Sequence, residues 1–205
     1  MPRELADRLK VFRQEHFPRY KERYRLLAER GQQPGTLFIG CSDARVLPDL
    51  LMDAKPGEVF TVRNVGNLVP PYEDAYGYHG TSAAIEFAVL ALRVRDIVVC
   101  GHSHCGAIRA LYQSPPEEAR HMNKWLDLAR EAVLPVTESE EALRRVEQRS
   151  VVLQLEHLLT FPMVARRVER GELFLHGWHY HVGSGRVEIL DVARGEFVAE
   201  GEDAA

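Results

Sequence analysis

Two short polar segments, CSDAR (41–45) and HSHCG (102–106), hold the residue types best suited to chemistry. Each directly follows an apolar run that predicts a β-strand. Thiolate and imidazole groups together suit zinc, so Cys41, His102 and Cys105 are candidate ligands. Three ligands leave one position of a tetrahedral ion free for water or an acidic side chain. Such a free position distinguishes catalytic from structural zinc sites.

The spacing of these residues indicates how the site is built. His102 and Cys105 are three residues apart at an expected helix start, which places both on one face. Cys41 would join them from a neighbouring strand. The alternative is a reduced cysteine pair beside an unrelated histidine. His104 is one residue from Cys105 and is expected to turn away, and Cys100 ends an apolar run and is interpreted as a small buried side chain.

Three further histidines, His176, His179 and His181, also resemble a metal cluster. They lie in a strand pattern, where successive side chains point to opposite faces, so His176 should face away from the other two. We interpret this segment as a packed or exposed strand rather than as a set of ligands.

Asp43 and Arg45 follow the first candidate ligand and are two residues apart, so an extended chain places them on the same side. An arginine fork can hold a carboxylate through two parallel hydrogen bonds. Held in this way, Asp43 would stay off the metal and accept the proton of a bound hydroxide, while Arg45 supplies positive charge. An ordinary surface ion pair is the alternative, but the closeness to Cys41 favours a functional pair.

Strand and helix patterns alternate along the chain. The expected strands cover residues 36–40, 57–62, 96–101, 172–182 and 186–192. The expected helices cover residues 81–92, 120–132, 138–158 and 162–170. A helical pattern also runs through the first 30 residues, where Pro18 suits the first turn of a second helix. The fold class is therefore α/β, with a mostly parallel sheet flanked by helices and an antiparallel C-terminal edge strand.

Composition excludes several classes of function. The 205 residues carry a formal charge of -4 and no block of basic residues, so nothing favours nucleic-acid binding. No apolar run approaches the roughly 20 residues that cross a bilayer. The first residues lack the apolar core of a signal peptide, and three cysteines do not suggest a disulfide framework. We expect a cytoplasmic protein without membrane or nucleic-acid partners.

The two polar segments resemble the signature of the β-class carbonic anhydrases. The similarity continues through RNVGN (63–67), GTSAAIEFAVLAL (80–92), HLLTFPMVARRV (157–168) and HGWHY (176–180). It implies a catalytic core over residues 31–192 within a single domain of residues 1–205, preceded by a helical arm over residues 1–30. The family fold is a parallel sheet flanked by helices, and its members assemble as even-numbered oligomers, so a homodimer or homotetramer is expected.

By this resemblance, Cys41, His102 and Cys105 bind one Zn²⁺ per chain, and Asp43 with Arg45 forms a catalytic dyad. The implied reaction is the reversible hydration of carbon dioxide to bicarbonate and a proton. A zinc-bound hydroxide, oriented by the dyad, would attack the carbon. Two thiolates leave a less positive metal centre than three neutral histidines would, so activity is expected to rise with pH through the neutral range.

The family divides into a plant-like group and a group regulated by bicarbonate at a second site. Regulated members use a tryptophan, an arginine and a tyrosine there. The matching residues here are Phe38, Arg63 and Tyr180, so the indole donor is absent. Plant-like members hold substrate with a glutamine that matches Gln32, and Phe60 and Val65 match the residues of their apolar pocket. The plant-like group is therefore favoured.

Other residues near the expected site complete this hypothesis. Phe87 stands where plant-like members carry a tyrosine, so the hydrogen bond of that hydroxyl is lost. Ser103 is expected to cap the helix that begins beside the metal. The free amides of its first turn, including that of Gly106, would favour an anionic product. Tyr72 and His79 are candidate proton shuttles.

Two other functions are compatible with the same residues. The first is a zinc hydrolase of another small cumulated substrate, such as carbon disulfide, on the same scaffold. The second is a non-enzymatic protein in which Asp43 closes the zinc site as fourth ligand. Pocket shape separates the first from a carbonic anhydrase, and an open coordination position excludes the second.

Overall fold

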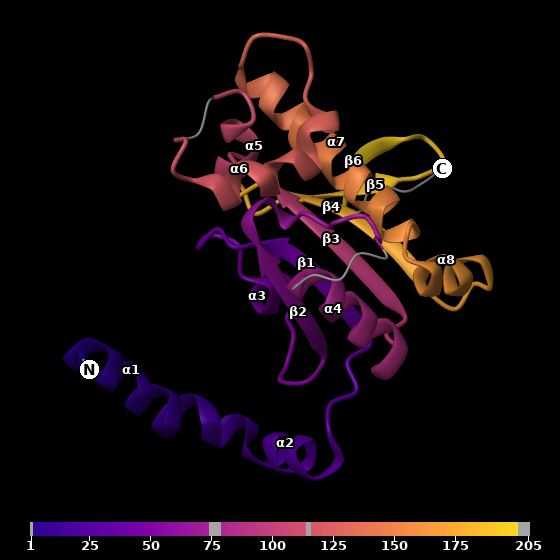
Figure 1. Cartoon of the computed structure of the whole chain (residues 1–205). Coiled ribbons are helices and arrows are strands. Elements are labelled where there is room, and N and C mark those ends of the chain that lie inside the picture. Colours follow the sequence, from indigo (N-terminus) through magenta and orange to yellow (C-terminus); the bar gives the residue numbers. More distant parts are fainter. Residues whose placement is uncertain (1, 74–78, 114–115, 201–205) are drawn as a thin grey trace.

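A central six-stranded sheet organises the computed structural model, which describes residues 2–73, 79–113 and 116–200. Its strands are β1 Thr36–Cys41, β2 Val59–Asn64, β3 Asp96–His102, β4 Phe174–Tyr180, β5 Val187–Asp191 and β6 Glu196–Ala199. Their order is β2-β1-β3-β4-β5-β6; the first four run parallel, and β5 and β6 are antiparallel to their neighbours. The predicted α/β class is confirmed (Figure 1).

The antiparallel end of the sheet has one strand more than expected. Residues 186–192 were predicted to form the edge, but β6 pairs with β5 on its outer side. Gly195 has φ +68° in the turn between these strands, a conformation that glycine adopts at little cost. The four residues of β6 show too little alternation to predict a strand.

Helices are packed mainly on one face of the sheet. The longer ones are α4 Gly80–Glu86, α6 Arg120–Leu126, α7 Glu140–Leu159 and α8 Pro162–Glu169. Shorter elements are α3 Pro48–Leu51, η2 Val65–Asn67, η3 Phe87–Ala91, α5 Gly106–Ala110 and η4 Asp127–Ala132. The helix expected over 81–92 thus consists of α4 and a following π-helical turn, and the helix expected over 120–132 of α6 and a following 3-10 turn.

The main core lies between the sheet and helices α4, α7 and α8. Alternate strand residues enter it, including Leu37, Ile39, Ile97 and Val99, which are fully buried. The intervening residues Phe38, Val98 and Cys100 are buried on the opposite face beside the residues after α3. Burial on both faces explains why β1 and β3 are almost continuously apolar in sequence.

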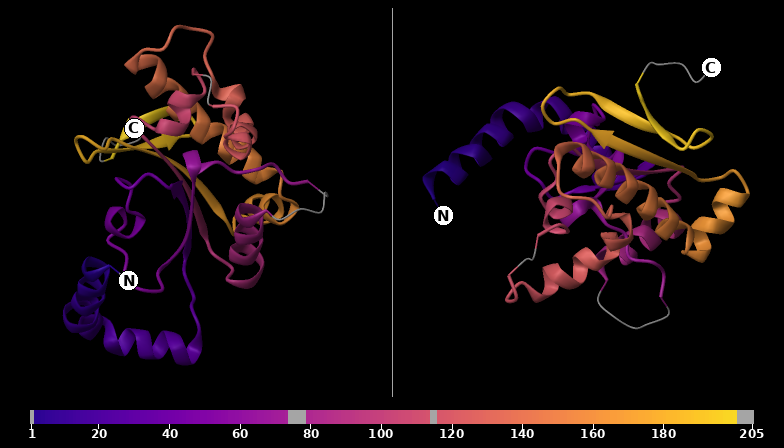
Figure 2. Two further views of the ribbon diagram at one scale, coloured as in Figure 1. Left: turned by 60° about the vertical axis from the view of Figure 1, so that its left-hand side comes forward. Right: turned by 90° about the horizontal axis from the view of Figure 1, so that it is seen from above.

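Residues 3–30 form an arm that extends away from the sheet (Figures 1 and 2). It comprises α1 Arg3–Val11, the π-helical turn η1 Phe12–His16 and α2 Phe17–Arg30, and none of their residues is buried. Pro18 lies in the first turn of α2, where its missing N–H has no cost. Leu5 and Leu9 are about half exposed, at 50% and 55%. Within one chain the apolar stripe of α1 therefore stays largely exposed, whereas Leu27 of α2 packs against Gly57.

Within the described part of the chain, no helix combines the length and the apolar character that crossing a membrane requires.

Candidate active site

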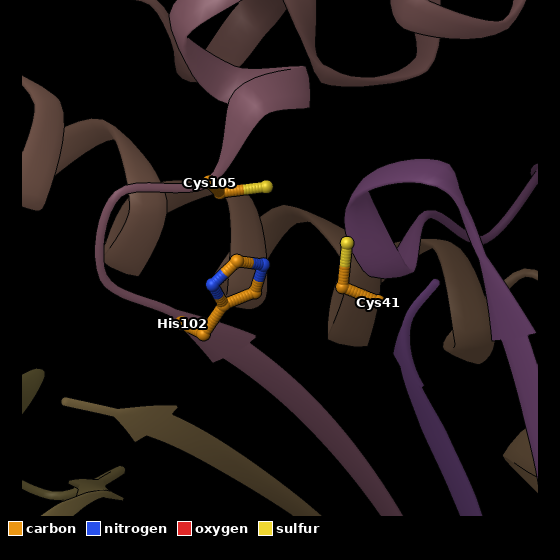
Figure 3. A group of neighbouring side chains, drawn as sticks. All are labelled: Cys41, His102 and Cys105. Atoms are coloured by element: carbon orange, nitrogen blue, oxygen red, sulfur yellow. The ribbon is translucent and has the colours of Figure 1, made fainter. Parts of the chain in front are cut away.

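The three predicted ligands lie together at one edge of the sheet. β1 and β3 are parallel neighbours, so their carboxyl ends bring Cys41 close to His102. The chain then turns through two residues and returns Cys105 to the start of α5. Both Sγ atoms and a ring nitrogen of His102 lie within 4.8 Å of one another (Figure 3). All three side chains are buried, Cys41 being the most exposed at 5%.

This donor set fits a zinc ion. Nδ1 of His102 lies 3.0 Å from the carbonyl oxygen of Ser103, to which it can donate. That bond leaves the lone pair on Nε2, which is buried and has no hydrogen-bond partner in the described structure. A buried nitrogen without a partner is costly unless it binds a metal. Two thiolates and one imidazole are ligands that zinc prefers.

The two cysteine thiols of the metal-free chain titrate differently. A hydrogen bond from Cys105 lowers the pKa of Cys41 to about 4. The backbone N–H groups of Asp43 and Gly66, each 3.4 Å from the Cys41 sulfur, act in the same direction. The same thiol–thiolate contact raises the pKa of Cys105 well above its usual value. The pair therefore shares one negative charge before a metal binds.

Metal-free protein is expected to contain one thiolate per chain at pH 7, because the pKa of Cys41 is about 4. Since this pKa is lowered, the thiolate is present at neutral pH and is lost as the pH falls through about 4. Ultraviolet thiolate absorbance during an acid titration measures it. Cys41→Ser should abolish the transition. Cys100→Ala should keep it, because burial raises the pKa of Cys100 to about 12. A metal-free protein without any thiolate at pH 7 would contradict this assignment.

Asp43 and Arg45 form a two-armed ion pair on the loop after β1. Arg45 Nε donates to Oδ1 of Asp43 at 2.9 Å, and Nη2 donates to Oδ2 at 2.7 Å. Nη2 also donates to the carbonyl oxygen of His104 at 3.1 Å, which ties this loop to the one that carries Cys105. The Arg45 guanidinium holds the pKa of Asp43 well below its usual range. The carboxylate is therefore charged throughout the neutral range.

The dyad lies beside the ligands without belonging to them. Oδ2 of Asp43 is 3.9 Å from Nε2 of His102, the nitrogen that faces the two sulfurs. The ligand group of Cys41, His102 and Cys105 includes neither Asp43 nor His104. His104 is exposed and has φ +57°, and this left-handed conformation belongs to the tight turn between His102 and Cys105.

Comparison with known proteins decides the family of the chain. The family model for carbonic anhydrases matches residues 36–187. The solved structure of the β-carbonic anhydrase CcaA is similar with a TM-score of 0.89 and 38% identity, and the match covers 96% of this chain and 98% of that one. This chain belongs to the β-class carbonic anhydrases. The resemblance noted in the sequence is thereby confirmed.

Other relatives of this carbonic anhydrase extend the similarity. A carbonic anhydrase of Pseudomonas aeruginosa is 42% identical, over 98% of this chain and 92% of its own length. Beta carbonic anhydrase 6, mitochondrial, of Arabidopsis thaliana is 35% identical, over 88% of this chain and 64% of its own. One of two tetrameric β-carbonic anhydrases from Sordaria macrospora has a TM-score of 0.72 and 29% identity, with 92% of both chains covered.

Two residues of the RNVGN segment support Cys41 in ways the sequence did not reveal. Gly66 donates its N–H to the sulfur from a left-handed conformation, φ +82°, and a Cβ there would lie 3.0 Å from the Cβ of Ala107. Arg63 donates to the carbonyl oxygens of Cys41 and Asp43 at 3.0 and 2.7 Å. Its guanidinium thus holds the loop that carries the candidate ligand Cys41.

Glu147 on α7 is a further unforeseen residue of this carbonic anhydrase. It is only 3% exposed, and its Oε1 accepts the backbone N–H of Cys105 at 3.0 Å. A glutamate within a helical pattern is normally exposed, so its sequence carries no signal for this role. Through this bond, α7 fixes the start of α5 and with it one metal ligand.

The expectation that Ser103 caps the next helix is wrong. α5 begins at Gly106, which is exposed, and the residue before it, Cys105, occupies the cap position without a side-chain cap bond. The left-handed turn at His104 carries the chain away from Ser103, whose Oγ instead accepts the N–H of Val182 at 3.0 Å. The amides of the first turn act on the Cys105 sulfur, where those of Ala107 and Ile108 favour the thiolate.

Gln32 and Phe60, two predicted substrate contacts, lie far from the metal ligands of their own chain. Gln32 precedes β1 by four residues, whereas Cys41 ends this six-residue strand. A strand of that length spans about 17–20 Å. Phe60 is the register partner of Leu37 near the start of β1, and its ring packs against Phe87 with centroids 5.8 Å apart. Within one chain, neither residue therefore adjoins the candidate ligands.

Val65 occupies the same edge as the ligands, directly after β2, and is 45% exposed. Trp125 donates its indole N–H to the carbonyl oxygen of Val65 at 2.7 Å. Trp125 also lines a surface cleft of about 910 Å³ with Tyr72 and His79, the two candidate shuttles. The described lining of this cleft does not include the metal ligands.

Proposed function

We propose that this carbonic anhydrase catalyses the reversible hydration of carbon dioxide at a zinc ion held by Cys41, His102 and Cys105. The supporting observation is the buried group of two sulfurs and one unpartnered imidazole nitrogen at the carboxyl edge of the sheet. Family membership supports carbon dioxide and bicarbonate as the substrate pair. A zinc ion bound there would lower the pKa of a water ligand and so provide a nucleophile near neutral pH.

Asp43 and Arg45 would act on the reacting groups from one side. The Arg45 fork engages both carboxylate oxygens, so Asp43 is held in one orientation and kept from closing the ligand set. Its Oδ2 lies next to His102 Nε2 and retains a lone pair that can accept the O–H of the nucleophile. This contact orients the attacking lone pair toward carbon. The Arg45 charge favours the anionic product.

We also infer that the active form is a homo-oligomer, a dimer or a tetramer. Leu5 and Leu9 of the arm are about half exposed, and Phe87, which packs against Phe60, and Leu90 are 48% and 57% exposed. Exposed apolar groups in this number favour contact with a second copy. In such an assembly, Gln32 and Phe60 of one copy would reach the active site of the other.

A stopped-flow assay tests the proposed function. Protein with one zinc per chain should hydrate carbon dioxide well above the buffer rate, lose this activity when a chelator removes the metal, and regain it when zinc returns. Carbon disulfide, supplied in a parallel assay, should give no comparable turnover. Zinc-loaded protein that hydrates carbon dioxide no faster than metal-free protein would overturn the proposal. Preferential hydrolysis of carbon disulfide would support the hydrolase instead.

A further inference from the structure

A second group of possible metal ligands lies between strands β4 and β5. It consists of His179, His181 and Glu188, whose ligand atoms all lie within 4.8 Å of one another. His179 and Glu188 are register partners on antiparallel strands, so their side chains share one face of the sheet. His181 lies two residues beyond His179 and points to the same side. None of the three belongs to the Cys41 site.

Two histidine nitrogens of this group face the same carboxylate oxygen, and that of His181 is at ion-pair distance from it. Nδ1 of His179 and Nε2 of His181 lie 3.7 and 3.0 Å from Oε2 of Glu188. Nδ1 of His179 is buried and has no hydrogen-bond partner in the described structure, whereas Nε2 of His181 is buried and pairs with the carboxylate. Buried polar atoms are almost always paired. Ligand atoms of a tetrahedral zinc site, at about 2.0–2.1 Å from the ion, lie about 3.3 Å from one another. The two distances to Oε2, 3.0 and 3.7 Å, lie on either side of this value.

The ligands are already oriented by neighbours, as in built metal sites. Nε2 of His179 lies 3.1 Å from Oε2 of Glu147, and the His179 side chain is fully buried. A metal-binding histidine commonly donates its other N–H to a carboxylate, and this arrangement leaves Nδ1 with a free lone pair. The Gln148 amide donates to Oε2 of Glu188 at 2.8 Å and so fixes the third ligand.

The charge of the group also suits a cation. Glu147 and Glu188 bring two carboxylates into a nearly buried space, 3% and 7% exposed, and the histidines are neutral when they bind metal. Arg186 opposes a cation, since its Nη2 donates to Oε1 of Glu188 at 3.0 Å. Its side chain is 55% exposed, so solvent screens the charge, and it engages the oxygen that faces away from the histidines.

We propose that His179, His181 and Glu188 bind a second divalent transition-metal ion. Two imidazoles and one carboxylate suit Zn²⁺ and Co²⁺. The ion would enter beside His181, whose side chain is 16% exposed, and a water molecule would complete its coordination there. Glu147 joins this ion to the active site, because one of its oxygens engages His179 and the other accepts the N–H of Cys105. The proposal is independent of the reaction assigned to the Cys41 site.

Equilibrium dialysis of the purified enzyme against buffered Zn²⁺, followed by metal analysis, tests the second site. The unmodified protein should saturate at two zinc ions per chain. His181→Ala and Glu188→Gln should each saturate at one. These changes are chosen because His179 is fully buried and its replacement endangers folding. His176→Ala is the matched control, since His176 lies on the same strand but pairs with Asp96 at 2.8 Å, and it should retain two ions.

Cobalt spectra separate the two sites. The Cys41 site should give a sulfur-to-cobalt charge-transfer band, whereas the second equivalent of Co²⁺ should add only weak ligand-field bands, because its ligands hold no sulfur. Saturation of the unmodified enzyme at one ion would overturn the proposal and would leave the histidines as an ion-paired cluster. A second metal ion that still binds to both the His181→Ala and the Glu188→Gln proteins would also overturn the proposal. A missing sulfur band would instead refute the zinc ligands of the proposed function, and the zinc stoichiometry of the second site would stay measurable.

Discussion

Replacing Cys105 by serine is expected to remove zinc from this carbonic anhydrase and to lower carbon dioxide hydration by about 10³-fold or more. A serine hydroxyl stays protonated at neutral pH and is a weak ligand for zinc, so only Cys41 and His102 would remain to hold the ion. The buried lone pair of His102 Nε2 would also lose the cation that satisfies it. Metal analysis after dialysis and a stopped-flow assay measure the two effects.

Cys100→Ala serves as the matched control for this substitution. Cys100 is also buried and lies on β3, the strand that leads to Cys105, but its side chain enters the cluster with Phe38 and Val98. Its removal should leave zinc content and turnover unchanged. A Cys105→Ser protein with one zinc per chain and unaltered turnover would show that the second sulfur is not a ligand.

The sheet and the meeting of the three ligands were predictable because they follow from local patterns and one rule of topology. The apolar runs before Cys41 and His102 predict buried strands, and parallel neighbours present their carboxyl ends at one edge. The family motifs point to the same residues. The alternation that separates His176 from His179 and His181 also follows from strand geometry alone.

The supporting contacts were not predictable because they depend on elements distant in sequence. Glu147 reaches Cys105 only because α7 crosses the end of β3, and nothing in a helical pattern marks one glutamate as buried. Glu188 faces His179 through a strand register that the loop between β4 and β5 decides. The alternation of side chains alone led us to interpret this segment as a packed or exposed strand. Gln32 is assigned only by its match to a family position, although the strand predicted over residues 36–40 already separates it from Cys41.

Asp43→Asn is expected to lower turnover by about 10²–10³-fold while one zinc per chain remains bound. Asparagine has the size of aspartate but lacks its charge and keeps only one acceptor oxygen. It therefore cannot serve both the fork of Arg45 and the O–H of the nucleophile. The pKa of Asp43 lies well below its usual range, so the group does not titrate near neutrality. The rate should therefore fall evenly across the neutral range without a shift of the pH profile.

Arg45→Lys tests whether the fork itself is needed, because lysine keeps the positive charge but cannot bind both carboxylate oxygens. Its turnover should fall by about 10–100-fold, as for other residues that orient a reacting group. If the pair works as one unit, the double substitution should cost little more than Asp43→Asn alone. Asp127→Asn is the control, since Asp127 forms an exposed pair with Arg130 at 3.1 Å and should keep full activity. Independent, additive losses of turnover would contradict a dyad that works as one unit. Loss of zinc from the Asp43 variant would contradict a carboxylate that acts beside the metal and does not bind it.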